Sequence, residues 1–169
     1  MTGCLLTGSP GVGKTTLITE VLSKANKQAG GFYTQEIRSG GVRQGFKIIT
    51  LDGTEAVLAH VAINSPHRVG KYGVDIKNLE NVAVAAIHRA IEQSDLIVID
   101  EIGKMELFSP LFKEAVLKAI DSSKKVLGTI MLKPNPFADA IKHHPAVDII
   151  VLTRDNRNEV VAHILDWLK

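Results

Sequence analysis

Residues 8–15 read Gly8-Ser9-Pro10-Gly11-Val12-Gly13-Lys14-Thr15 and match the pattern G-x-x-x-x-G-K-[ST] at every defined position. An apolar run at residues 4–7 comes directly before them, and apolar residues at helical spacing follow over residues 17–25. The pattern therefore lies between an expected strand and an expected helix. There the glycines let successive backbone N–H groups point at an anion, and the helix adds the positive end of its dipole. These residues predict a phosphate-binding loop.

The loop also supplies candidate ligands for a polyphosphate and a metal ion. We expect the Lys14 ammonium to bridge the β- and γ-phosphate oxygens. The Thr15 hydroxyl is expected to ligate Mg²⁺, which contacts the same oxygens. Thr16 is expected at the α-phosphate. The predicted ligand is a nucleoside triphosphate with magnesium.

After the first helix the chain changes to short extended runs separated by turns. Strands are expected over residues 32–38, 46–51 and 55–61, with turns at residues 39–41 and 52–53. These runs predict an antiparallel meander, inserted at about residues 32–61. We expect Gly30-Gly31 to stop the first helix, and residues 64–75 to form an irregular loop.

The second half of the chain alternates helical and extended patterns. Helices are expected over residues 79–91, 111–120, 137–143 and 158–168. Strands are expected over residues 96–100, 125–131 and 147–152. Alternation of this kind produces a mostly parallel sheet with helices on both faces. The sequence thus predicts a single α/β domain over residues 1–169: a three-layer α/β/α P-loop fold that carries the meander.

Two adjacent carboxylates, Asp100 and Glu101, end the apolar run that begins at Leu96. Side chains at successive strand positions point in different directions, which allows the two acids different tasks. We expect Asp100 to serve the magnesium shell and Glu101 to polarise the attacking water as general base. A purely structural role, capping the strand end and the next loop, is the alternative for each.

Composition excludes several classes of partner. The 169 residues carry a net charge of +2, with no clustered basic patch, so neither nucleic acid nor a membrane surface is an expected partner. The chain has 45% hydrophobic residues but no apolar run as long as a membrane span, and no signal peptide is recognisable. The one cysteine, Cys4, fits a reducing compartment and a place in the core. We expect a cytoplasmic monomer.

Several segments together resemble one known family, the THEP1-type nucleoside-triphosphatases. The resemblance extends over nearly the whole chain, to residues 156–157. It is carried by the phosphate loop and by four further segments: Gly31-Phe32-Tyr33-Thr34-Gln35-Glu36-Ile37-Arg38, Gly45-Phe46, Lys71-Tyr72-Gly73-Val74-Asp75 and Asp100-Glu101-Ile102-Gly103-Lys104-Met105-Glu106-Leu107.

The resemblance implies a RecA/AAA-like core and hydrolysis of ATP, GTP, CTP and UTP to the diphosphate and phosphate. It also implies that nucleotide binding extends from the phosphate loop to a second segment, made of Leu96, Ile97, Val98, Ile99, Asp100, Glu101, Ile102 and Gly103.

A cation facing the γ-phosphate would stabilise the charge that develops in the transition state. Arg38 is the leading candidate, with Lys71 and Lys104 behind it and Arg68 weaker. Arg157 follows the last strand and is a candidate for stacking on the base. An exposed or ion-paired role, or helix capping near Arg157, is the competing interpretation.

Two other functions remain possible on sequence grounds. The first is a nucleoside or nucleotide kinase, although no separate acceptor-binding insert is obvious apart from the meander. The second is a nucleotide-dependent switch, although the chain lacks an Asn-Lys-x-Asp base reader. The acid next to Asp100 favours activation of water, and hydrolysis is the leading prediction.

Overall fold

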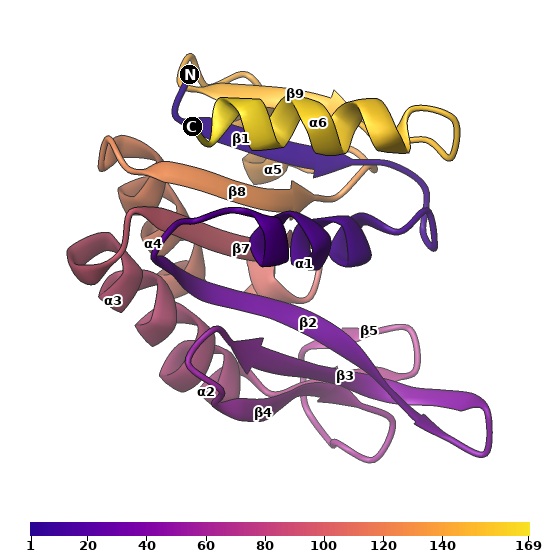
Figure 1. Cartoon of the computed structure of the whole chain (residues 1–169). Coiled ribbons are helices and arrows are strands. Elements are labelled where there is room, and N and C mark those ends of the chain that lie inside the picture. The colour runs from indigo at the N-terminus through magenta and orange to yellow at the C-terminus, as the bar shows by residue number, and fades with distance from the viewer.

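A computed structural model describes all residues from Met1 to Lys169. Nine strands form one sheet in the order β5-β6-β4-β3-β2-β7-β8-β1-β9 (Figure 1). The strands are β1 (Gly3–Thr7), β2 (Ala29–Ser39), β3 (Val42–Thr50), β4 (Glu55–His60), β5 (Arg68–Val69), β6 (Tyr72–Val74), β7 (Leu96–Ile102), β8 (Lys125–Ile130) and β9 (Val147–Val151).

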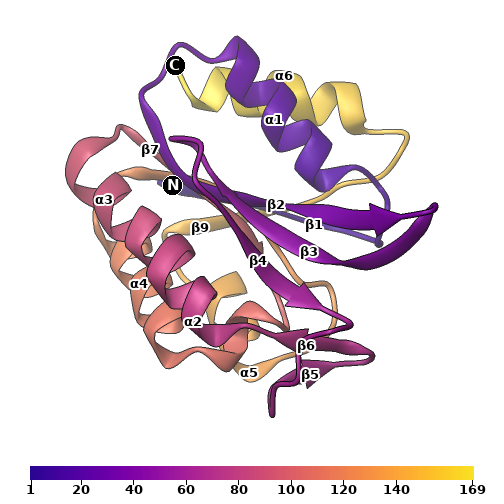
Figure 2. The same cartoon turned by 90° about the horizontal axis from the view of Figure 1, so that it is seen from below.

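Helices cover both faces of this sheet, as the alternating pattern predicts (Figure 2). On one face lie α1 (Lys14–Lys24) and α6 (Arg157–Trp167). On the other lie α2 (Ile76–Asn78), which continues through a π-helical segment (Leu79–Val84) into α3 (Ala85–Gln93), and also α4 (Pro110–Asp121) and α5 (Pro136–Lys142). Each face has its own apolar core. The three-layer α/β/α prediction is confirmed.

Local sequence signals fix where several helices begin. The Ser109 hydroxyl accepts a hydrogen bond from the Phe112 N–H ahead of α4, and Pro110 opens that helix. Asn135 caps α5 in the same way, and Asp75 caps α2. Side-chain oxygens of this kind satisfy N–H groups that the first helical turn leaves free. None of the helices combines the length and apolarity needed to cross a membrane.

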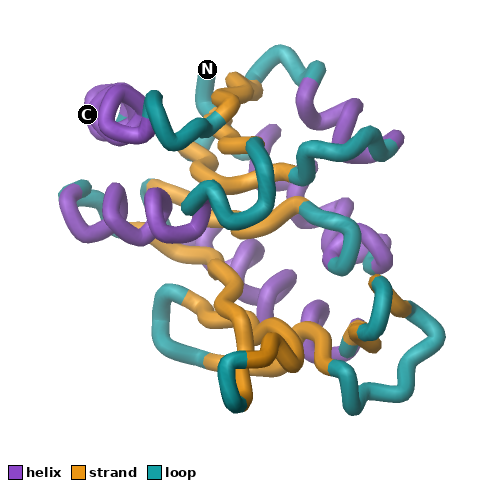
Figure 3. Tube along the Cα trace, turned by 90° about the vertical axis from the view of Figure 1, so that its right-hand side faces the viewer, coloured by secondary structure: helices purple, strands orange, loops and turns teal.

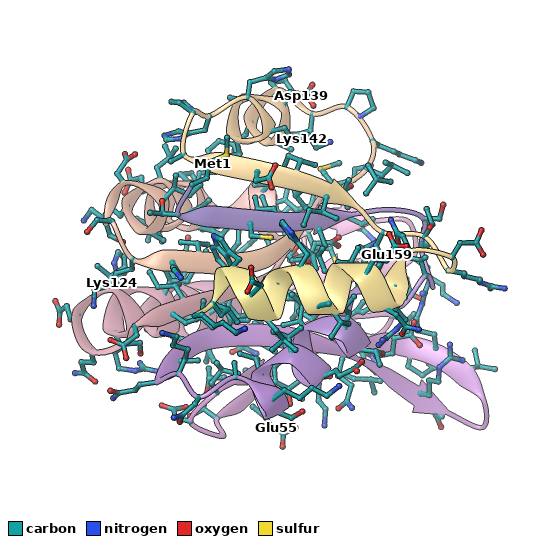
Figure 4. All side chains as sticks on the ribbon, turned by 45° about the horizontal axis from the view of Figure 1, so that its top comes forward. Met1, Glu55, Lys124, Asp139, Lys142 and Glu159 are labelled. Atoms are coloured by element: carbon teal, nitrogen blue, oxygen red, sulfur yellow. The ribbon has the colours of Figure 1, made fainter.

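The parallel part of the sheet consists of β2, β7, β8, β1 and β9. Their carboxyl ends share one edge, and Figure 3 looks onto that edge, where loops gather. Strand β8 lies between β1 and β7, so the acidic pair is not on the strand beside the phosphate loop. Charged side chains such as Glu55 and Glu159 stay on the outside of the layers (Figure 4).

The predicted meander is an extension of the same sheet and not a separate insert. Strand β2 pairs in parallel with β7 over Ala29–Phe32, and its remaining length pairs antiparallel with β3. Strands β4, β6 and β5 continue the antiparallel part. The prediction of three strands and two turns is confirmed, but the first of the strands also completes the parallel core.

Two local expectations are wrong. Helix α1 already ends at Lys24, and Gly30 and Gly31 lie inside β2. A Cβ atom on Gly31 would lie 2.0 Å from the Val98 carbonyl oxygen, so this glycine permits the close approach of β2 to β7. Residues 64–75 are not wholly irregular, because they contain the short hairpin β5–β6. Both strands are short, which is why periodicity does not reveal them.

Candidate active site

The phosphate loop curls between β1 and α1 as the glycine spacing predicts. Gly11 and Gly13 have φ angles of 78° and 99°, a region that L side chains rarely adopt. A Cβ atom on Gly8 would lie 2.7 Å from the Leu152 carbonyl oxygen, so the start of the loop packs tightly against the end of β9. The Lys14 ammonium donates to the Gly8 carbonyl oxygen at 2.8 Å. The lysine thus folds over the hollow that its own loop forms.

Asp100 links the loop to the middle of the sheet. Its Oδ2 accepts from the Thr15 hydroxyl at 2.7 Å, and its Oδ1 accepts from the Thr129 hydroxyl at 2.6 Å. Burial raises the pKa of Asp100 above its usual value, although both hydrogen bonds act in the opposite direction. Thr129 belongs to β8, the strand between the loop and the acid. Sequence reasoning missed it, because nothing in the apolar run of β8 marks its one hydroxyl as a partner of Asp100.

Glu101 lies against the cleft next to the loop, and the residues after it leave room for its side chain. A Cβ atom on Gly103 would lie 2.7 Å from Glu101 Oε1. Burial, and then the neighbouring Asp100, raise the pKa of Glu101, while the Lys14 ammonium lowers it. Glu106, in a one-turn 3₁₀ helix (Glu106–Phe108), is 4% exposed. Burial and the proximity of Glu101 raise the pKa of Glu106 well above its usual value.

A cleft of about 870 Å³ lies between the phosphate loop and the β2–β3 hairpin. Lys14, Thr15, Thr16 and Glu101 all line it, so the structure brings these four predicted residues to one cavity. Within residues 96–103, Glu101 lines the cleft, whereas Leu96, Ile97, Val98 and Ile99 are fully buried in the two cores. The hairpin contributes the opposite wall: Tyr33, Thr34, Gln35, Glu36, Arg43 and Phe46.

The structure does not bring Arg38 to this cleft. Its side chain is 55% exposed, and its guanidinium is paired with Glu36 at 2.7 Å and also donates to the Gly41 carbonyl oxygen. The arginine that lines the cleft is Arg43, directly across the hairpin from Arg38. A β-bulge at Ile37/Arg38 changes the register there, and this bulge could not be read from the sequence.

The other predicted cations also lie outside the cleft lining. Lys71 Nζ lies 5.5 Å from the centroid of the Tyr72 ring, and Lys104 is exposed. Arg68 donates to the carbonyl oxygens of Ile63 and Lys71, so it holds its own loop in place.

A second hollow, of about 260 Å³, adjoins the other side of the phosphate loop. It is lined by the loop residues Ser9, Pro10, Gly11 and Val12 and by Leu152, Thr153 and Arg154. Arg157 is not part of this lining, because its Nη1 donates to Glu20 on α1 at 2.7 Å. The arginine that sequence reasoning placed near a base is thus held by an ion pair, and Arg154 is the one that faces the hollow.

The donor set fits a magnesium ion shared with a phosphate. No group of three or more His, Cys, Asp or Glu side chains is arranged to hold a metal ion. Mg²⁺ takes oxygen ligands, usually keeps several waters, and binds through one or two protein oxygens together with substrate phosphates. The Thr15 hydroxyl and the Asp100 carboxylate at the end of the loop are oxygens of this kind.

These features define a class of protein. The phosphate loop follows the first strand of the parallel part of the sheet, and the threonine hydroxyl that ends its motif donates to an acid two strands away. This is the arrangement of the P-loop nucleoside triphosphatases. A family model described as NTPase matches residues 3–165, and the chain belongs to this family.

Relatives and solved structures agree with this assignment. The chain is 53% identical over 165 residues to nucleoside-triphosphatase THEP1 of Thermotoga sp. strain RQ2, covering 98% of this chain and 94% of that protein. It is 41% identical to the human cancer-related nucleoside-triphosphatase over 95% of this chain and 93% of the relative. The crystal structure of THEP1 from Aquifex aeolicus superposes with a TM-score of 0.91 at 36% identity, over 99% of both chains.

Proposed function

We propose that this chain hydrolyses nucleoside triphosphates, including ATP, GTP, CTP and UTP, to the diphosphate and phosphate with Mg²⁺. The observation that carries the proposal is the 2.7 Å hydrogen bond between Thr15 and Asp100, which joins the phosphate loop to the acidic pair. The names of the relatives support the nucleoside-triphosphate substrate.

Binding begins with the backbone of residues 8–13 and the start of α1, whose N–H groups surround the phosphates. Lys14 exchanges its bond to the Gly8 carbonyl oxygen for the β- and γ-phosphate oxygens. Thr15 and Asp100 would hold the magnesium ion, which would supply charge that neutralises the phosphates. Thr16 contacts the α-phosphate from the first turn of α1.

Glu101 orients the attacking water and accepts its proton. Its carboxylate lines the cleft, and it directly follows Asp100 in the chain. Burial and the neighbouring Asp100 raise its pKa toward the pH at which a general base works best, and the Lys14 ammonium opposes that rise. The hollow beyond Ser9 and Arg154 takes the base and ribose, with few side chains that could read one base against another.

The test measures phosphate release from ATP and GTP with Mg²⁺, with and without a nucleoside or nucleoside monophosphate as acceptor. We expect release without an acceptor, and loss of binding and turnover in Lys14→Ala. The matched control is Lys27→Ala, an exposed lysine just after α1. Release that requires an acceptor would make the chain a kinase, and tight binding without turnover would make it a switch; either result contradicts the proposal.

A further inference from the structure

The hairpin wall of the cleft holds one arginine, Arg43, in a fixed place. Its Nε donates to the Tyr72 hydroxyl at 2.9 Å, and its Nη1 donates to Glu36 Oε1 at 3.3 Å. The guanidinium carbon lies 5.1 Å from the centroid of the Phe46 ring and 5.6 Å from that of Tyr72. Aromatic faces attract a guanidinium at these distances. Residues of three strands, β2, β3 and β6, therefore contact this side chain and fix its position.

The two aromatic rings next to Arg43 also pack against each other. Phe46 and Tyr72 meet edge to face, with ring centroids 5.4 Å apart. A Cβ atom on Gly45 would lie 2.2 Å from the Ala59 carbonyl oxygen, and one on Gly73 would lie 2.1 Å from that of Ile63. Gly45 thus permits the close approach of β4 to β3 beside Phe46, and Gly73 permits that of the Ile63 backbone to β6 beside Tyr72. Three of the distinctive sequence segments, residues 31–38, 45–46 and 71–75, converge on one guanidinium.

The charge of Arg43 is only partly compensated within the protein. Glu36 makes its short contacts with Arg38, at 2.7 and 2.8 Å, and a longer one with Arg43. Tyr72, a neutral phenol, accepts from Nε, and Nη2 makes no hydrogen bond to the protein. A guanidinium is charged at its ordinary pKa, and the hydrogen bond to Tyr72 raises the pKa of Arg43 further. A cation that faces the cleft with donors to spare is suited to an anion within it.

We propose that Arg43, held by Tyr72, contacts the γ-phosphate and stabilises its charge in the transition state, an assignment that rests on the hydrolysis proposed above. Lys14 and the loop amides approach the phosphates from one wall of the cleft. Arg43 approaches from the opposite wall, where charge develops on the transferred group. Figures 1 and 2 show the β2–β3 hairpin extending past the same sheet edge as the loop between β1 and α1. Tyr72 acts as a positioning residue for the arginine.

The test compares Arg43→Ala with Arg89→Ala, an exposed arginine that is likewise paired with an acid, Asp52, but lies away from the cleft. Two quantities are measured: turnover at saturating Mg-ATP, and affinity for ADP with and without aluminium fluoride, which mimics the transferred phosphoryl group. We expect Arg43→Ala to lower turnover about 10³-fold. Its affinity for ADP should stay within about threefold, while the gain from aluminium fluoride is lost. Arg89→Ala should match the wild type in both measurements.

Two further variants separate positioning from contact. Tyr72→Phe keeps the ring and removes the acceptor, and should lower turnover about tenfold at unchanged KM, the value of one hydrogen bond to a charged group. Arg43→Lys keeps the charge without the planar fork and should lose most of the turnover. If circular dichroism shows that Arg43→Ala does not fold, the turnover of Arg43→Lys tests the role of Arg43 instead.

The possible failures are distinguishable. If the wild type releases no phosphate, the hydrolysis itself is refuted. If the wild type is active and Arg43→Ala turns over within threefold of it, or keeps the gain from aluminium fluoride, only the role of Arg43 is overturned. Loss of turnover in Arg38→Ala, with Arg43→Ala active, would also overturn it and return the role to the arginine favoured by sequence.

Discussion

The Thr15 hydroxyl donates a 2.7 Å hydrogen bond to Asp100 Oδ2, so the first turn of α1 and the end of β7 meet at one point. These residues are 85 positions apart in the chain. Thr129 holds the other carboxylate oxygen from the strand between them, which leaves Asp100 a fixed orientation. A fixed carboxylate beside a hydroxyl is a suitable partner for a metal ion that also contacts phosphate.

Asp100→Asn should therefore remove most of the magnesium dependence of nucleotide binding. A neutral amide attracts the cation less, and loss of such a partner commonly costs 10–100-fold in metal affinity. Calorimetric titration of ATP with Mg²⁺ and with a chelator gives the ratio of the two affinities. We expect that ratio to fall about tenfold or more. Asp148→Asn, at an exposed position on β9, is the control. An undiminished ratio in Asp100→Asn would remove Asp100 from the metal site.

Gly31→Ala should destabilise the protein by about 3 kcal/mol or more, because the added methyl group meets backbone and not a movable side chain. The Cβ atom would lie 2.0 Å from the Val98 carbonyl oxygen, at a φ of 105°. Gly40→Ala is the control: it also has positive φ, 57°, but open space around it, and should cost only about 1 kcal/mol. Urea denaturation measures both. Equal losses would show that the contact between β2 and β7 is not the reason for this glycine.

Glu106→Gln should make stability less dependent on pH. Burial and nearby Glu101 raise the folded-state pKa of Glu106 well above the ordinary 4.5, so the folded protein holds this proton more tightly than the unfolded chain does. Stability then falls as pH rises from about 4.5 to the raised value, and the loss persists above it. Glutamine has no proton to lose, so the melting temperature of the variant relative to wild type should rise by several degrees between pH 5 and pH 8.

Asp100 and Glu101 remain in both proteins of that comparison, and their raised pKa values add a trend of the same direction to each. The difference between the two melting curves therefore reports Glu106 together with its interaction with these two acids. A difference that stays constant over this pH range would mean that Glu106 is not held protonated by its surroundings.

Much of the fold followed from local patterns in the chain. The alternation of helical and extended patterns in the second half of the chain predicted a mostly parallel sheet with helices on both faces. Gly8–Thr15, between an apolar run and a helical stripe, predicted the phosphate loop. Gly30-Gly31 misled because a pair of glycines is also what a helix stop requires. Gly31 is needed because β7, which is distant in sequence, approaches β2 closely at this point. The local spacing of residues does not reveal such a contact.

The residues of the candidate site that belong to sequence motifs could be predicted. Lys14, Thr15 and Glu101 line one cavity, and Asp100 meets Thr15. Arg43 was not singled out, since its place depends on a β-bulge and on Tyr72, which comes from a hairpin too short to show a pattern. Thr129 was missed for a similar reason. Its partner comes from a neighbouring strand, and strand order is a property of the whole sheet.

Glu101 is proposed to activate the water that hydrolyses a triphosphate held by the loop, and the variant Glu101→Gln removes its charge while keeping its shape. The measurement pairs calorimetric binding of Mg-ATP with phosphate release, using Glu114→Gln, an exposed glutamate on α4, as the control. We predict that Glu101→Gln binds Mg-ATP within about threefold of the wild type and releases phosphate 10²–10⁴-fold more slowly. Phosphate release at the wild-type rate from Glu101→Gln would show that Glu101 is not the general base.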